Sequence, residues 1–160
     1  MAARQITVRP YNQRMARRVA RRAHVDGEGA VAVAFTFNNL ATMIILGVIE
    51  DVAQFIPAVG GLVELAISVF GFYFHRIVLV TEQNVYVFRD WPFHYPGKLL
   101  MKQQRGPGVV RLGAPDASGF MRFIRRGQLT FQDGTVVYHG FIWIKRVMYV
   151  AQEANIPAGQ

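Results

Sequence analysis

The sequence predicts an α+β fold in which a small, bent antiparallel β-barrel or sandwich of about seven strands is closed by a C-terminal helix. Three observations predict it. Short β-rich runs alternate with turn signals after residue 74, and an apolar repeat with helical spacing ends the chain. The charges also fall in blocks, because residues 1–25 hold seven Arg and no acid, whereas residues 26–74 hold no Lys or Arg. We therefore expect a basic N-terminal helix and an apolar helical hairpin beside the sheet.

The composition is that of a folded chain. Of the 160 residues, 52% are hydrophobic and 12% are aromatic, which excludes a disordered protein. The chain has no Cys, which excludes a disulfide framework, a Cys-ligated metal site and a thiol nucleophile. The net charge of +8 would by itself suggest a nucleic-acid partner. Its distribution around an apolar block favours an anionic membrane instead.

Residues 11–25 are expected to form an amphipathic helix after Pro10. Its narrow apolar stripe recurs every four residues, at Tyr11, Met15, Val19 and Ala23. Three interpretations of this helix remain open: an element beside an anionic membrane, which we favour, a nucleic-acid-binding arm, and a solvated helix without a partner. The expected contacts to lipid headgroups or phosphates are the arginines of this helix and one that follows the apolar block: Arg14, Arg17, Arg18, Arg21, Arg22 and Arg76.

The apolar block over residues 30–74 can be divided in two ways. The first division gives two spans, 30–49 and 55–74, of the length that crosses a bilayer. Both ends of the chain would then lie on the cytoplasmic side, because the flanking cations favour that side. The second division gives a strand at 30–37, followed by two shorter helices at 40–56 and 62–74.

We favour the second division, because Asn38, Asn39 and Glu64 are costly at the centre of a bilayer. It predicts a helical hairpin over residues 38–74 that dips into the cytoplasmic membrane while both termini stay in the cytoplasm. The hairpin is also an expected surface for homo-oligomer formation. The alternative to membrane insertion is a soluble hairpin that packs on the rest of the chain or is buried in an oligomer. The residues expected to insert into the membrane are its large apolar ones: Ile44, Ile45, Leu46, Ile49, Phe55, Ile56, Leu62, Ile67, Phe70 and Phe72.

The part of the chain after residue 74 is expected to form a β module. Its clearest turn signals are a tight hairpin at 82–84 and the Asp133-Gly134 pair. A helix at 141–155 follows and is stopped by Pro157. The expected strands are 75–81, 85–89, 98–103, 108–113, 120–125, 128–132 and 135–139.

Two hairpins and the last helix resemble the bacterial pleckstrin-homology-like (PH-like) domains. The hairpins are VLVTEQNVYVF at 78–88 and LTFQDGTVVYH at 129–139, and the helix ends in AQEANIP. In that family a Gly-Glu pair often precedes the first strand, and Gly27-Glu28 is similar. The resemblance implies a binding or scaffolding module rather than an enzyme. It does not carry over phosphoinositide recognition, because the apolar block replaces the family's basic loop between the first two strands.

The residues that could carry chemistry form no catalytic, metal-binding or cofactor-binding set. Neither Ser68 nor Ser118 lies in a nucleophile motif, and no two of the four His have ligand spacing. The Gly-Pro-Gly turn after Arg105 lacks the Lys and Ser/Thr of a phosphate loop. The loop at 90–97 is different, because it crowds three aromatic rings together with Pro92 and Pro96 and cannot bury all three rings locally. It is expected to be a partner-binding tip or an interfacial aromatic anchor, and the alternative is that the rings cap the sheet core. The expected partner-binding residues are these rings, Trp91, Phe93 and Tyr95.

These observations predict a non-enzymatic protein without a cofactor. The hairpin and the basic helix would hold it at the cytoplasmic membrane, where the PH-like module would meet a protein or lipid partner. The alternative is a soluble basic protein that binds nucleic acid through its Arg-rich arm. The expected parts are the basic helix, the first strand, the apolar hairpin and the remaining module, at 1–27, 28–37, 38–74 and 75–156.

Overall fold

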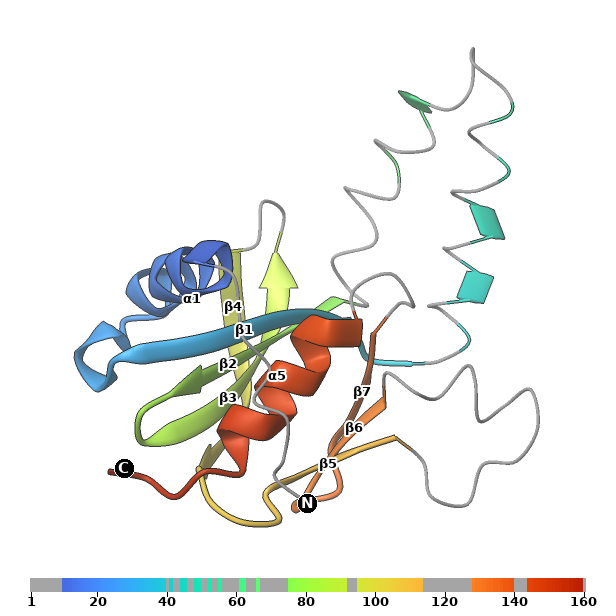
Figure 1. Cartoon of the computed structure of the whole chain (residues 1–160). Coiled ribbons are helices and arrows are strands. Elements are labelled where there is room, and N and C mark those ends of the chain that lie inside the picture. Colours follow the sequence, from blue (N-terminus) through green and yellow to red (C-terminus); the bar gives the residue numbers. More distant parts are fainter. Residues whose placement is uncertain are drawn as a thin grey trace.

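The computed structural model describes residues 10–39, 75–91, 95–113, 128–139 and 144–159, together with ten separate positions between residues 41 and 66. The elements assigned in these parts of the chain are two α-helices, one 3-10 helix and seven strands (Figure 1). In chain order they are α1 (Pro10–Arg22), η1 (Asp26–Glu28), β1 (Ala30–Phe37), β2 (His75–Thr81), β3 (Asn84–Trp91), β4 (Tyr95–Gln104), β5 (Val110–Leu112), β6 (Gln128–Phe131), β7 (Val136–Tyr138) and α5 (Ile144–Ala154).

The seven strands form one antiparallel sheet in the order β4-β3-β2-β1-β7-β6-β5. The pairing of β1 with β2 is long and runs from Ala30 opposite Thr81 to Phe37 opposite His75. Within the described residues, β1 meets β7 only where Phe37 lies opposite Tyr138. The sheet therefore consists of a four-stranded part and a three-stranded part that are joined at one point.

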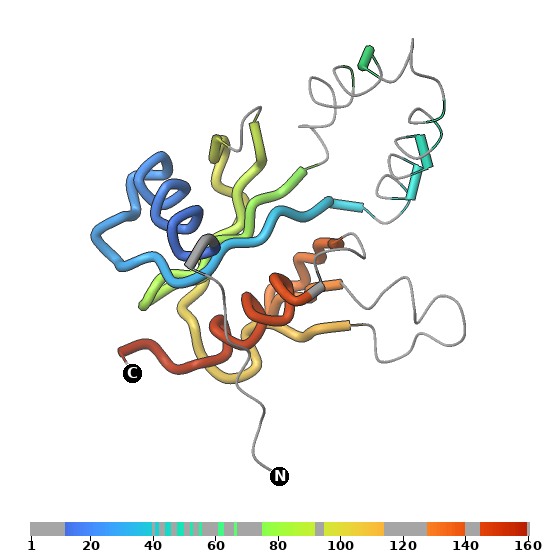
Figure 2. Tube along the Cα trace, turned by 45° about the horizontal axis from the view of Figure 1, so that its top comes forward, coloured from blue at the N-terminus to red at the C-terminus, as the bar shows by residue number. Residues whose placement is uncertain are grey.

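The two α-helices cover opposite faces of the four-stranded part, as Figures 1 and 2 show. Successive residues of a strand point to opposite faces of a sheet. Val78 of β2 accordingly lies in the buried cluster that includes Val147 of α5, whereas its neighbour Ile77 lies in the cluster that includes Val19 of α1. Because β2 is covered on both faces, its sequence is a continuous apolar run rather than an alternating one.

The α+β class, the antiparallel sheet and most of the predicted strands are confirmed. The strands β1 and β2 have the predicted bounds. The hairpin of β3 and β4 is longer than predicted, because pairing continues to Trp91 opposite Tyr95. The strand predicted at 120–125 and the first residues of the predicted last helix, 141–143, lie outside the described residues.

The prediction of a protein anchored in the cytoplasmic membrane is wrong. In the described part of the chain, no helix combines the length and the apolar character that crossing a membrane requires. The two α-helices have 13 and 11 residues, whereas a span needs about 20. The first of the two alternative spans, at 30–49, begins instead with the strand β1.

The helical hairpin predicted over residues 38–74 is likewise not supported, because the two α-helices whose bounds are assigned, α1 and α5, lie elsewhere in the chain. Most of residues 38–74 lie outside the described residues. Five of the residues predicted to insert are described and have exposed fractions between 39% and 87%: Ile44, Ile45, Ile49, Phe55 and Leu62. The other five lie outside the described residues: Leu46, Ile56, Ile67, Phe70 and Phe72.

The apolar stripe of the basic helix meets the sheet rather than a lipid surface. Val19 is fully buried there, and Met15 and Ala23 pack against the same cluster. The described side chains do not include that of Tyr11. The buried side also contains Ala16 and Ala20, so it is wider than the predicted stripe. Since this apolar surface is already covered by protein, it is not available to enter a membrane.

Candidate functional site

A polar contact from Asn12 holds helix α1 on the sheet in addition to its apolar side. The Asn12 side-chain amide donates to the carbonyl of Val33 and its carbonyl oxygen accepts from the Val33 N–H, both at 3.1 Å. Asn12 therefore pairs with the backbone of β1 as a neighbouring strand would. The helix is fixed in one rotation, which exposes four arginines on its outer side: Arg14, Arg17, Arg18 and Arg21.

The end of α1 is a Schellman turn that has a histidine where glycine is usual. The N–H of Val25 donates to the carbonyl of Ala20 at 3.0 Å, and the N–H of His24 donates to that of Arg21 at 3.2 Å. His24 has a φ of 57°, in the left-handed region that costs an L-residue about 1–2 kcal/mol. The turn places the exposed imidazole beside the last arginines of the helix.

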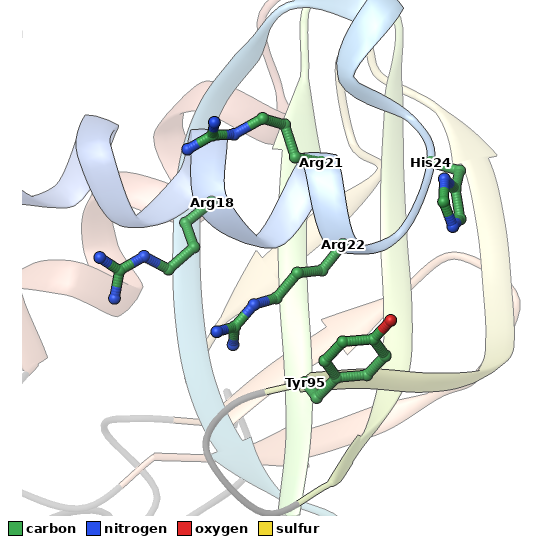
Figure 3. Close-up of a pocket in the computed structure, with 5 residues that line it drawn as sticks. All are labelled: Arg18, Arg21, Arg22, His24 and Tyr95. Atoms are coloured by element: carbon green, nitrogen blue, oxygen red, sulfur yellow. The ribbon is translucent and has the colours of Figure 1, made fainter.

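An open hollow of about 300 Å³ lies between the end of α1 and the start of β4. Its lining residues are Arg18, Arg21, Arg22, His24 and Tyr95 (Figure 3). The guanidinium carbon of Arg22 lies 5.6 Å from the centre of the Tyr95 ring, which is a cation–π distance. Three guanidinium groups thus surround the hollow together with an imidazole and a phenol, and none of the five lining residues is acidic.

The hollow is continuous with an aromatic pair at the end of the β3–β4 hairpin. Trp91 lies opposite Tyr95 in the strand register, and each residue is 49% exposed. The indole of Trp91 occupies the space above Gly97, where an added Cβ would collide with its Cδ1 and Nε1 atoms. Glycine at this position therefore leaves room for the indole beside the backbone of β4. The third ring of the predicted partner-binding loop, Phe93, lies outside the described residues.

Guanidinium groups suit phosphate or carboxylate ligands, because each presents several N–H donors in a planar fork. The hollow brings three of them to one place and adds an aromatic surface beside them. The sixth predicted phosphate contact, Arg76, does not line it. Arg76 lies on β2 opposite Arg89 of β3, and its pKa is lowered by burial and by the charge of Arg89. Arg76 is thus separate from the basic side of α1.

The strained position of His24 gives a stability prediction. Replacing His24 by glycine is expected to raise the free energy of unfolding by about 0.5–1 kcal/mol, because glycine adopts the left-handed conformation without a steric cost. Valine at this position is expected to destabilise the protein, since β-branched residues disfavour positive φ. Urea denaturation of the three proteins measures both changes. A stability order with valine above glycine would contradict the Schellman assignment.

A second polar cluster surrounds Glu28, next to the turn that connects β2 to β3. Its carboxylate accepts hydrogen bonds from the Thr81 hydroxyl at 2.7 Å, the Asn84 amide at 2.9 Å and the Tyr86 hydroxyl at 2.5 Å. The ammonium group of Lys102 lies 3.8 Å away. These partners come from β2, β3 and β4, so one side chain connects three strands to the segment that precedes β1.

The pKa values show that this cluster favours the ionised carboxylate. Burial by itself would raise the pKa of Glu28, but the hydrogen bonds from Asn84, Tyr86 and Thr81 and the charge of Lys102 outweigh it and lower the pKa. The pKa of Tyr86 is raised well above its ordinary value, first by burial and then by its bond to Glu28. Because its carboxylate oxygens already accept hydrogen bonds from Thr81, Asn84 and Tyr86, Glu28 is a structural residue rather than a ligand-binding one.

A buried arginine joins the last helix to the sheet. Arg105 follows β4 and donates from Nε to the Ile156 carbonyl at 3.1 Å and from Nη1 to the Thr81 carbonyl at 3.2 Å. Its Nη2 lies 3.4 Å from the Glu153 carboxylate. The next N–H, that of Gly106, donates to the carbonyl of Ala154 at 3.0 Å. The predicted turn after Arg105 is therefore a fixed attachment point for α5.

Comparison with models of protein families, with curated proteins and with solved structures found no significant match to this chain.

Sequence reasoning identified the arginines and Tyr95 as separate candidates but did not predict that they meet at one hollow. The helix and the 90–97 loop are far apart in the sequence, and no local pattern indicates that Tyr95 lies beside Arg22. His24 was also missed, because a positive φ at a histidine has no sequence signature. For Glu28 a signal existed, since the Gly-Glu pair before the first strand was noted in the resemblance. Arg105 gave no signal beyond its position before a turn.

Proposed function

We propose that the protein is a non-enzymatic, PH-like binding module that binds nucleic acid through the basic side of α1 and the adjoining hollow. The observation that carries the proposal is the convergence of Arg18, Arg21 and Arg22 with Tyr95 around one open site. Arginine clusters neutralise phosphates, and displacement of the phosphates' counterions drives binding. A helix fixed on a sheet presents these charges in a constant geometry, which a solvated helix would not.

The strand order supports the PH-like part of the proposal. The strands β1 to β4 and β5 to β7 are two antiparallel series of neighbours, and α5 packs against the sheet with Val147 and Val150 in its core. The connection between β1 and β2 is the long segment 38–74, which contains no Lys or Arg. This segment therefore supplies no cation for a ligand, and the arginines that line the hollow come from α1, a helix outside the β module.

The extent of the basic side favours a polymer over a small anion. Arg14, Arg17, Arg18 and Arg21 are exposed along about two turns of the helix, so their charges are spread over about 10 Å. A single phosphate contacts one or two guanidinium groups, whereas a nucleic-acid strand can contact successive ones. The absence of acidic residues before residue 26 means that no charge of the helix itself opposes such binding.

Binding of fluorescein-labelled oligothymidylate, followed by fluorescence anisotropy over a series of salt concentrations, tests the proposal. The wild-type protein is expected to bind at low salt, with a logarithmic affinity that falls linearly with the logarithm of salt concentration. The double variant Arg18→Gln/Arg21→Gln is expected to bind more weakly. Its slope is expected to be smaller by about 1–1.5, since each lost phosphate contact on a single strand removes about 0.7.

A matched double variant separates this site from the general positive charge of the protein. Arg111 on β5 and Lys145 on α5 are both exposed and lie away from α1, at the far edge of the sheet and on its other face. Arg111→Gln/Lys145→Gln removes the same charge and is expected to keep nearly the wild-type slope. If the two double variants lost affinity and salt slope equally, this result would contradict a binding site on α1. A wild-type protein that does not bind at low salt would exclude the function.

A further inference from the structure

Two exposed aromatic rings stand beside the cations of the hollow, and the phosphate contacts do not require them. Trp91 and Tyr95 form a cross-strand pair at the end of the β3–β4 hairpin, and each is half-exposed. An exposed tryptophan costs stability, because its large apolar surface stays in water. Exposed aromatic rings next to a basic surface are the arrangement on which unpaired bases stack.

The local structure holds these rings in place. The indole of Trp91 lies over Gly97, where any larger residue would displace it. The ring of Tyr95 lies under the guanidinium group of Arg22 at 5.6 Å. A ring that is already ordered loses little conformational freedom when a ligand stacks on it. In Figure 3 the Tyr95 ring lies beside the Arg22 side chain at the hollow, and Trp91 is the partner of Tyr95 across the two strands, so a strand bound in the hollow would pass close to both rings.

We propose that this site selects single-stranded over double-stranded nucleic acid, with a base stacked on Trp91 and the neighbouring phosphates bound by Arg18, Arg21 and Arg22. The inference rests on the proposed function and adds the class of ligand to it. In a duplex the bases stack on one another and are not accessible to an outside ring. Arginines alone would bind a duplex at least as well, because its phosphates are denser. The aromatic pair supplies the discrimination.

Anisotropy titrations with three probes test the selectivity: labelled oligothymidylate, the same oligonucleotide in a duplex with oligoadenylate, and polyglutamate as an unlabelled competitor. The wild-type protein is expected to bind the single strand roughly tenfold more tightly than the duplex, which is the effect of about one stacked base. The variant Trp91→Ala is expected to lose this factor for the single strand and to leave duplex binding unchanged. Trp91→Phe, which keeps a ring, is expected to retain most of it.

The control for Trp91→Ala is Leu112→Ala, which removes an exposed apolar side chain from β5 at the opposite edge of the sheet. This variant is expected to bind both probes as the wild type does. The intrinsic fluorescence of Trp91 provides a second readout of stacking, which does not require the indole to be removed. The chain has two tryptophans, so Trp143→Phe leaves Trp91 as the only one, and stacking is expected to quench its emission when oligothymidylate is added.

The outcomes separate this inference from the proposed function. Equal affinity for single strand and duplex, or an unquenched Trp91 at saturation, would overturn the stacking while the function stands. Polyglutamate that competes as well as oligothymidylate would show an acidic-polypeptide site and overturn the inference. If neither nucleic acid binds at low salt, the proposed function fails first.

Discussion

Replacing Arg105 by alanine is expected to lower the free energy of unfolding by about 3–5 kcal/mol, because it removes one member of a buried ion pair. The change would leave the Glu153 carboxylate without its guanidinium partner. It would also leave the carbonyl groups of Thr81 and Ile156 without the donors that now bind them. These groups belong to β2, α5 and the segment after α5, so one deletion weakens the attachment of the last helix to the sheet.

Urea denaturation followed by circular dichroism measures this effect. Arg105→Lys is expected to fall between wild type and alanine, since an ammonium group keeps the charge but cannot bind three separated acceptors in a planar fork. The control Arg111→Ala removes an exposed arginine and is expected to change stability by less than about 0.5 kcal/mol. An Arg105→Ala protein as stable as this control would show that the contacts of Arg105 do not hold the helix.

Replacing Glu28 by alanine is expected to lower the free energy of unfolding by about 2–4 kcal/mol, because three buried or half-buried donors lose a charged acceptor. Tyr86 and Thr81 are almost fully buried, so no water replaces the carboxylate without rearrangement. The variant Tyr86→Phe removes one of the three hydrogen bonds and is expected to cost about 1 kcal/mol. Urea denaturation of the two variants measures both values. A cost for Tyr86→Phe equal to that of Glu28→Ala would contradict a shared network.

The lowered pKa of Glu28 also fixes the direction of the pH dependence. A carboxyl group whose pKa is lower in the folded state than in the unfolded state contributes stability above its unfolded pKa. This contribution is lost as the pH falls through the folded pKa, that is, below the ordinary value of 4.5. The stability difference between wild type and Glu28→Gln is therefore expected to shrink as the pH falls below about 4.5. A difference that grows on acidification would contradict the lowered pKa.

The strands could be predicted because their signals are local. In β1 and β2, runs of β-branched and aromatic residues end at turn residues, and both strands begin and end where these signals place them. The end of the β3–β4 hairpin was less predictable. Pro96 and Gly97 are unfavourable in a strand interior, yet pairing continues to Trp91 and Tyr95 with irregular register on the edge strand. An edge strand tolerates such residues because one side needs no partner.

The candidate site could be predicted only in part. The arginines at 14–22 follow from composition and helical spacing, and the 90–97 loop follows from its crowded rings. Their meeting at the hollow depends on how α1 crosses the sheet, which no local signal in either segment specifies. The same crossing decides that Arg76 lies elsewhere. In the sequence, nothing distinguished Arg76 from the arginines of α1 as a phosphate contact.

By itself, the sequence determined the α+β class, the strands with clear turn signals, and a basic helix with one apolar side. Only the tertiary structure decided which surface that apolar side meets. Hydrophobic burial is non-directional, so a stripe such as Met15, Val19 and Ala23 suits a bilayer or a sheet equally well. The choice was made by shape and by one specific contact: small residues at Ala16 and Ala20 allow close packing, and Asn12 pairs with the backbone of Val33. The arginines consequently face outward around a site, and the membrane that the charge pattern suggested has no apolar face of α1 to bind.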